Sequence, residues 1–174
     1  PDLFVSRDAW EGMAPNSLYR NDIGYFVDIA PEAGMADSTD SFTATWLDFD
    51  LDGKVDLYVA NGVTGSGGRN SLFHNRKNST FEDAAASAGV ADSAKTIGTA
   101  AGDYDGDGWT DLYLVNIGAL NRLFRNNGDG TFSDDAEEAG VLFPVEGGYV
   151  TFFFDCDNDG DLDLFAATMS AFPD

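Results

Sequence analysis

Short apolar stretches rich in β-branched and aromatic residues recur along the chain, separated by polar turn residues. Residues 111–116 (Asp-Leu-Tyr-Leu-Val-Asn) and 121–126 (Asn-Arg-Leu-Phe-Arg-Asn) have the length and composition of β-strands. The sequence Asn-Asn-Gly-Asp-Gly at 126–130 predicts a tight turn into a further strand. Residues 83–89 predict one or two turns of helix that end at Gly89. The pattern therefore predicts mainly β structure with a short helical turn in a connection.

The same order of signals returns along the chain. The matching segments are residues 46–61, 102–116 and 154–167. Their first aspartates, Asp48, Asp103 and Asp155, lie 55 and 52 residues apart. Three further features keep this step: a Leu-aromatic pair beginning at Leu18, Leu72 and Leu123, a phenylalanine at Phe26, Phe81 and Phe132, and a glycine at Gly34, Gly89 and Gly140. We therefore predict three repeats of about 52–55 residues, each with about four antiparallel strands.

The start of the chain fits the same register. Residues 2–5 (Asp-Leu-Phe-Val) match residues 56–59 (Asp-Leu-Tyr-Val), so residues 1–5 are interpreted as the end of a preceding repeat. Asp2 then occupies the last position of a loop. We interpret residues 1–174 as one all-β array of repeats, without a second domain.

Each repeat contains the pattern Asp-x-Asp-x-Asp-Gly-x-x-Asp, at residues 48–56, 103–111 and 155–163. Aspartates at positions 1, 3 and 5 can converge on one cation when the chain curls tightly, and glycine at position 6 permits that turn. A backbone carbonyl at position 7 and a carboxylate at position 9 complete the shell. The predicted ligands are Asp48, Asp50, Asp52, Lys54 and Asp56; Asp103, Asp105, Asp107, Trp109 and Asp111; and Asp155, Asp157, Asp159, Asp161 and Asp163. Oxygen ligands in this number favour Ca²⁺ over Mg²⁺, with about three ions per chain.

An EF-hand is the first alternative, and the sequence excludes it. That loop needs a glutamate at position 12 and a helix on each side. Position 12 is Val59, Leu114 or Ala166 here, and both flanks have strand character. Ordinary acidic turns are the second alternative. Three copies in fixed register argue against them.

Composition and charge limit the partners. The formal net charge is -22, with 31 acidic and 9 basic residues, which argues against nucleic acid and anionic membrane. No apolar run approaches the about 20 residues that span a bilayer, so we expect no membrane insertion. Cys156 and His74 are the sole cysteine and histidine, so a Cys-based zinc site and a His-dependent catalytic set are disfavoured. We expect a protein that is not an enzyme.

These motifs resemble a known family. Asp-Tyr-Asp-Gly-Asp-Gly-Trp-Thr-Asp-Leu-Tyr at 103–113, followed by Asn-Arg-Leu-Phe-Arg-Asn-Asn-Gly-Asp-Gly-Thr-Phe at 121–132, is similar to the FG-GAP/VCBS repeat of the cartilage-acidic-protein and ASPIC/UnbV-associated type. The resemblance implies integrin-α-like blades of a β-propeller, with calcium in a loop joining two strands of each blade. Three blades do not close a propeller, which usually has 4–8. We therefore expect a partial or open array.

The resemblance also implies a secreted, extracellular or cell-surface location and a role in adhesion or recognition. We expect a calcium-stabilised recognition or structural module that binds a protein or glycan ligand. The alternative is a subunit of a head-to-tail filament formed with copies of itself, and a propeller enzyme is less favoured. Asn78 begins the glycosylation acceptor Asn-Ser-Thr.

Three smaller expectations concern single side chains. Cys156, at position 2 of the third loop, is expected to be buried. The aromatic residues of 152–154 and Trp46 are expected to lie in the core between blades. His74 is expected to pack or hydrogen-bond on its strand and not to bind metal.

Overall fold

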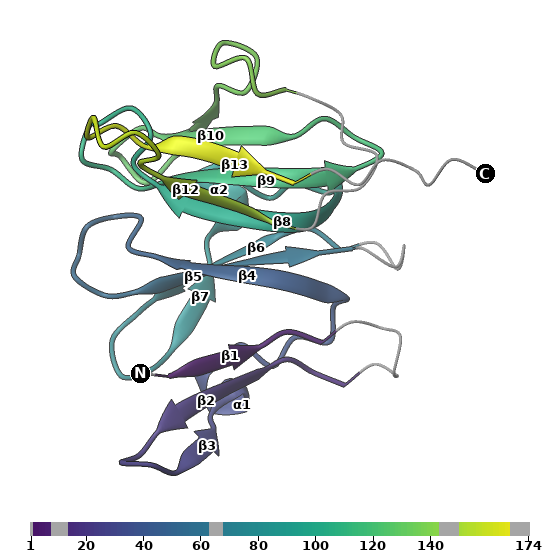
Figure 1. Cartoon of the computed structure of the whole chain (residues 1–174). Helices are drawn as coiled ribbons and strands as arrows, with labels where there is room; N and C mark the ends of the chain where they lie inside the picture. The colour runs from purple at the N-terminus through teal and green to yellow at the C-terminus, as the bar shows by residue number, and fades with distance from the viewer. Residues whose placement is uncertain (1, 8–13, 63–67, 143–149, 168–174) are drawn as a thin grey trace.

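The computed structural model describes residues 2–7, 14–62, 68–142 and 150–167. These residues form four antiparallel sheets, which we call blades 1 to 4 (Figure 1). Blade 1 contains β1 (Leu3–Val5), β2 (Ser17–Asn21) and β3 (Phe26–Asp28), and blade 2 contains β4 (Ser41–Leu47), β5 (Asp56–Asn61), β6 (Ser71–Asn75) and β7 (Phe81–Asp83). Blade 3 contains β8 (Lys95–Gly102), β9 (Asp111–Ile117), β10 (Arg122–Asn126) and β11 (Phe132–Asp134), and blade 4 contains β12 (Thr151–Phe154) and β13 (Asp163–Ala166).

Blades 2 and 3 have identical topology. Consecutive strands pair in order from β4 to β7 and from β8 to β11, so each blade is a four-stranded meander. The first strands β4, β8 and β12 lie next to one another, as expected for blades arranged around an axis. The prediction of β-propeller-type blades of about four antiparallel strands in an open array is confirmed.

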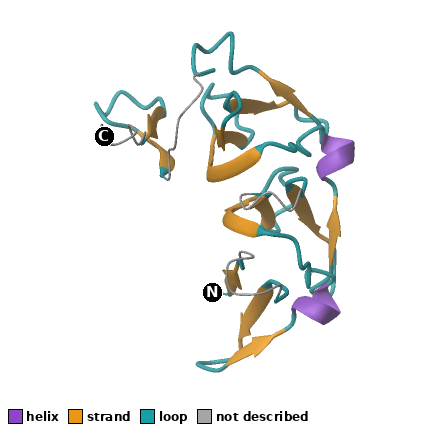
Figure 2. Cartoon of the chain, turned by 90° about the vertical axis from the view of Figure 1, so that its right-hand side faces the viewer, coloured by secondary structure: helices purple, strands orange, loops and turns teal. Residues whose placement is uncertain are grey.

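The helical turns also follow the repeat. The helices α1 (Ala30–Ala33) and α2 (Ala85–Ala88) follow the last strands of blades 1 and 2, and Figure 2 shows both on the same side of the stack. Gly89 ends α2 in the left-handed conformation with φ 81°, so the prediction of a helix that stops there is confirmed. Neither helix is long or apolar enough to cross a membrane.

Alternation along the second strand of each blade builds the core. Leu112 and Leu114 of β9 pack in the cluster shared with blade 2, whereas Tyr113 and Val115 pack in the cluster shared with blade 4. Successive side chains of a strand point to opposite faces, so one strand serves both interfaces. The second strands β5 and β9 are therefore apolar on both faces and almost completely buried.

Two expectations about burial are wrong. Cys156 is exposed, although Phe49, at the same position of the first loop, is buried against Phe132 of blade 3. Trp46, Phe152 and Phe154 are exposed as well, whereas Phe153 packs against the core cluster shared by blades 3 and 4, as expected. The residues at position 2 become buried through the following blade, and none of the described residues forms a blade that follows blade 4.

Candidate metal centres

The three aspartate loops lie at equivalent places in the fold. Each joins the first strand of a blade to the second, from β4 to β5, β8 to β9 and β12 to β13, and all project from the same end of the blades, at the left in Figure 1. The glycine at position 6 has positive φ in all three loops, 81° at Gly53, 91° at Gly108 and 100° at Gly160. A side chain at this position would be strained, which explains the constant glycine.

The carboxylate at position 1 organises the turn. Asp48 accepts hydrogen bonds from the backbone N–H groups of Asp52 and Gly53, at 3.2 and 3.0 Å. Asp103 and Asp155 accept the equivalent bonds in their own loops, at distances between 2.9 and 3.2 Å. These bonds curl the backbone around the carboxylate and hold the loop conformation before any cation is considered.

The carboxylate at position 9 connects the loop to the body of the blade. Asp111 is completely buried; its Oδ2 accepts the N–H of Tyr104 at 3.0 Å and its Oδ1 accepts the N–H of Asn126 at 2.7 Å. Asp56 makes the same pair of bonds with Phe49 and Asn75. Burial raises the pKa of both aspartates to about 6. A buried carboxylate with a raised pKa is where a nearby cation stabilises the charged form most.

Blade 1 repeats this contact with the first described residue. Oδ1 of Asp2 accepts the N–H of Asn21 at 2.9 Å, as Asp56 accepts the N–H of Asn75. Asp2 therefore occupies the place of position 9, which is where the repeat register put it.

Carboxylates from positions 1, 3 and 9 converge in every loop. One oxygen from each lies within 4.8 Å of the others in three groups: Asp48, Asp50 and Asp56; Asp103, Asp105 and Asp111; and Asp155, Asp157 and Asp163. Three carboxylates this close repel one another unless a cation lies among them. Oxygens in this number and spacing suit a hard divalent cation, so the residues present fit such an ion.

The carboxylate at position 5 makes different contacts from those at positions 1, 3 and 9. Asp52, Asp107 and Asp159 lie outside these three groups, and each accepts the N–H of the residue at position 7. The ammonium of Lys54 forms an ion pair with Asp52, and this hydrogen bond lowers the pKa of Asp52. Ligation by position 5 and by the carbonyl groups of Lys54, Trp109 and Asp161 stays a prediction.

The third loop differs in its surroundings. Asp163 is exposed and accepts the N–H of Cys156 at 2.9 Å, and the hydrogen bond from the Cys156 side chain is the main cause of its lowered pKa. The described part of blade 4 contains no third strand that donates an N–H group to Asp163. We therefore expect this carboxylate to be held less firmly than Asp56 and Asp111.

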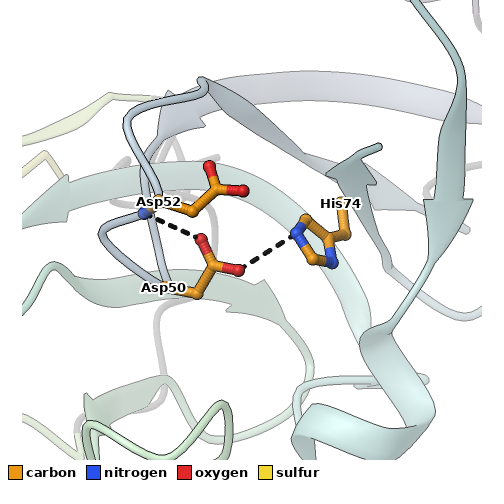
Figure 3. Close-up of side chains that lie close together, drawn as sticks. All are labelled: Asp50, Asp52 and His74. Atoms are coloured by element: carbon orange, nitrogen blue, oxygen red, sulfur yellow. Dashed lines mark hydrogen bonds and ion pairs between the residues drawn. The ribbon is translucent and has the colours of Figure 1, made fainter. Parts of the chain in front are cut away.

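His74 of β6 lies beside the first loop (Figure 3). Its Nε2 is 3.0 Å from Oδ2 of Asp50, and its ring meets Phe49 edge-on with centroids 5.2 Å apart. The expectation that His74 packs or hydrogen-bonds on its strand is confirmed by its packing against Phe49, and the expectation that it does not bind metal stays a prediction. Asp50, Asp52 and His74 also form a group of donor atoms within 4.8 Å.

Sequence reasoning did not find a buried polar relay between the blades. Asn70 of blade 2 donates from Nδ2 to Oγ1 of Thr96 in blade 3 at 2.8 Å, and this hydroxyl donates to Oδ1 of Asn116 at 2.7 Å. Asn16, Ser41 and Asn61 form the same relay between blades 1 and 2. The sequence did contain a signal for this relay, because Asn61 and Asn116 end matching segments of the repeat.

A cavity of about 690 Å³ lies between blades 1 and 2. It is lined by the cations Arg20, Lys54, Arg76 and Lys77 and by the exposed Trp46. Four of the nine basic residues of an acidic chain are thus gathered in one place. Asn78, the predicted glycosylation site, is an exposed turn residue in the same lining. Its modification stays a prediction.

With calcium chelated, we expect the free energy of unfolding to fall as pH rises from about 4 to about 7. Asp56 and Asp111 have folded pKa values of about 6, above the ordinary value of 3.8. A raised folded pKa contributes stability that is complete below the unfolded pKa and is lost as pH passes the folded pKa. After allowing for screening by solvent, we expect a loss of about 1–2 kcal/mol per carboxylate.

Urea denaturation in chelator at several pH values measures this slope. Asp111→Asn removes one of the titrating groups and should flatten it. Carboxylates with lowered pKa, such as Asp163, act below this window and leave it unchanged. Stability that increases between pH 4 and 7 would contradict the prediction.

Comparisons with known proteins agree with the geometry. The family described as FG-GAP-like repeat matches residues 48–114 and 103–166, which contain all three loops. Cartilage acidic protein 1 of Homo sapiens is 32% identical over 120 residues, covering 64% of this chain and 18% of that protein, and the Mus musculus protein is 31% identical with 64% and 19% covered. Cartilage acidic protein 1 of Xenopus tropicalis is 27% identical over 139 residues, covering 75% and 22%. The chain thus spans about a fifth of the length of these curated relatives.

Proposed function

Because the chain belongs to the family of FG-GAP-like repeat proteins, we propose that it is a calcium-binding module of β-propeller type whose metal loops stabilise the blades. The observation that carries this proposal is the repeated convergence of carboxylates from positions 1, 3 and 9 in three equivalent loops. A single acidic cluster is common on protein surfaces. The same cluster at the same turn of successive blades requires a shared cause, and a bound cation supplies one.

Calcium suits these sites better than the other common cations. The candidate donors of the three loops are oxygens, which Ca²⁺ accepts in number and in flexible geometry. Mg²⁺ demands a small octahedral shell and keeps its waters. Zn²⁺ prefers nitrogen and sulfur donors, and the chain has one histidine and one cysteine.

Extracellular recognition is the role that we propose for this module. Extracellular calcium modules bind at about 10⁻⁴–10⁻³ M, which suits an ion that is structural and permanently bound outside the cell. The relatives carry the name cartilage acidic protein, and an acidic chain that needs calcium fits a location outside the cell. A binding role is favoured over catalysis because the clustered carboxylates are held in the loops. The ligand would be a protein or a glycan.

Assembly with copies of itself is a second candidate function. Large apolar side chains are exposed on both outer blades, Tyr25 and Phe26 on blade 1 and Phe152 and Phe165 on blade 4. Contacts between unlike surfaces of two copies repeat without closing and generate filaments. The aromatic pair Phe152 and Phe165 is stacked with centroids 4.9 Å apart, which presents a flat apolar face.

Native mass spectrometry in calcium, repeated after chelation, tests both candidates. We expect about three bound Ca²⁺ per chain, because three loops have the same carboxylate cluster. A chain that binds no calcium and keeps the same compact charge-state distribution would contradict the calcium proposal. Dimers and higher species that increase with concentration support self-assembly, and a monomer at all concentrations excludes it. A triple variant with Asp48, Asp103 and Asp155 changed to Asn is the matched control for metal binding.

A further inference from the structure

The three metal loops are alike, but the neighbouring strand presents a different side chain to each. The residue before the asparagine that ends β2, β6 and β10 is Arg20 in blade 1, His74 in blade 2 and Arg125 in blade 3. This register lies directly beside the position-9 carboxylate, because the following asparagine donates its N–H to that carboxylate. The side chain at this register can therefore act on the metal loop from outside it.

Arg20 and Arg125 make their hydrogen bonds to carboxylates outside the three loops, although the charge of Arg125 also acts on Asp105. The Nε atom of Arg125 donates to Asp135 at 2.7 Å, and that of Arg20 donates to Asp22 at 2.8 Å. Neither Asp22 nor Asp135 belongs to one of the three metal loops. Within the described residues, His74 alone uses this register for a close contact with a predicted metal ligand, its Nε2 lying 3.0 Å from Oδ2 of Asp50.

His74 is held so that its nitrogen faces Asp50. The side chain is 14% exposed, and Phe49 packs edge-on against the ring. Figure 3 shows Nε2 directed at one oxygen of Asp50 while the other oxygen accepts the N–H of Asp52 at 3.2 Å. The contacts with His74 and with the N–H of Asp52 hold both oxygens of the Asp50 carboxylate.

We propose that His74 is a positioning residue for the first metal loop, where it donates Nε2–H to Asp50 and orients this carboxylate for the cation. The inference rests on the proposed calcium function, and it identifies a residue that sets the calcium affinity of the first loop. A ligand that is already oriented loses less rotamer freedom on binding the ion. Loss of such outer partners typically costs about 10–100-fold in metal affinity. The first loop is thus tuned by a direct contact from the neighbouring strand, and no equivalent contact is made to the second loop by Arg125.

Direct ligation by His74 is the competing arrangement. The nitrogen of His74 and one oxygen each of Asp50 and Asp52 are close enough to hold an ion among them. A nitrogen donor suits zinc and other first-row transition metals, whereas calcium takes oxygen ligands. The two arrangements differ in which metal responds to loss of the imidazole.

The test compares calcium titration of the whole chain with two variants of one residue. His74→Leu keeps apolar contact with Phe49 and removes the donor, whereas His74→Gln restores an N–H donor. By isothermal titration calorimetry, we expect one of three sites to weaken about 10–100-fold in His74→Leu and to recover largely in His74→Gln. Arg125→Leu, the same register in blade 3, should weaken none of the three sites, because Arg125 hydrogen-bonds to Asp135 and its positive charge beside Asp105 opposes a bound cation.

Several outcomes overturn the inference. Unchanged affinities in His74→Leu, or equal weakening of all three sites, would exclude a positioning role at one loop. Zn²⁺ that binds the wild-type chain but not His74→Leu, with calcium binding unaffected, would make His74 a direct ligand instead. Terbium luminescence sensitised by Trp109 in a Trp46→Phe background, which removes the tryptophan beside the first loop, reads the second loop and should be equal in all His74 variants. A wild-type chain without calcium sites would refute the proposed function itself, which is a different result.

Discussion

Chelation of calcium is expected to lower the melting temperature of the chain by about 15–30 °C. A ligand present at a hundredfold excess over its dissociation constant stabilises the folded state by about 2.7 kcal/mol per site. Three equivalent loops then supply about 8 kcal/mol, which is comparable with the whole stability of many domains. For a chain of this size each kcal/mol shifts the melting temperature by about 2–4 °C.

Thermal unfolding followed by circular dichroism in about 10 mM calcium, and again in excess EGTA, measures this difference. This calcium concentration is about a hundredfold above the tightest dissociation constant expected, about 10⁻⁴ M. Magnesium at the same concentration is the control, because it screens charge equally but fits the loops poorly. If magnesium protects as well as calcium, the effect is general screening of a chain with net charge -22. Equal melting temperatures with and without chelator would show that the loops do not need an ion to fold.

The repeat is what made the blades predictable from sequence. Leu18, Leu72 and Leu123 begin the apolar part of the matching strands β2, β6 and β10, and Phe26, Phe81 and Phe132 begin the matching strands β3, β7 and β11. A feature that recurs at a fixed step must occupy the same place in each structural unit. The repeat boundaries, the approximate number of strands per blade and the position of the loops followed from this one property. Asp2 could be aligned with Asp56 for the same reason.

Burial could not be predicted from the repeat, because it depends on the neighbouring blade. Phe49 and Cys156 hold the same position in their loops, but Phe49 contacts Phe132 and Cys156 is exposed. The aromatic residues Phe152 and Phe154 alternate in the same way as core residues elsewhere. The repeat pattern indicates which face of the β-sheet a side chain occupies. It does not report whether another sheet covers that face.

The arrangement of the carboxylates in the metal loop also could not be predicted from the sequence. The pattern Asp-x-Asp-x-Asp-Gly treats positions 1, 3 and 5 alike, whereas the structure gathers positions 1, 3 and 9. Position 5 instead accepts the N–H of the residue at position 7. The contact of His74 with Asp50 joins residues 24 positions apart in the chain, and only strand pairing reveals it.

Replacing Asp111 with alanine is expected to destabilise the chain by about 2–6 kcal/mol even in chelator. The carboxylate is completely buried and accepts the N–H groups of Tyr104 and Asn126. Each buried donor left without a partner costs about 1–3 kcal/mol. Asn126 also donates from Nδ2 to the carbonyl of Phe49 in blade 2 at 2.7 Å, so its displacement weakens the contact between two blades.

Urea denaturation separates this structural role from the metal-binding role. Asp107→Ala, at the exposed position 5 of the same loop, should cost less than about 1 kcal/mol in chelator, because water satisfies the N–H group that it leaves. In calcium, Asp111→Ala should lose the stabilisation of one site in addition. A cost within about 0.5 kcal/mol of wild type in chelator would mean that the carboxylate serves the ion alone. A large cost under both conditions shows that the position-9 aspartate binds the loop to its blade first, and that calcium stabilises a turn the protein has already formed.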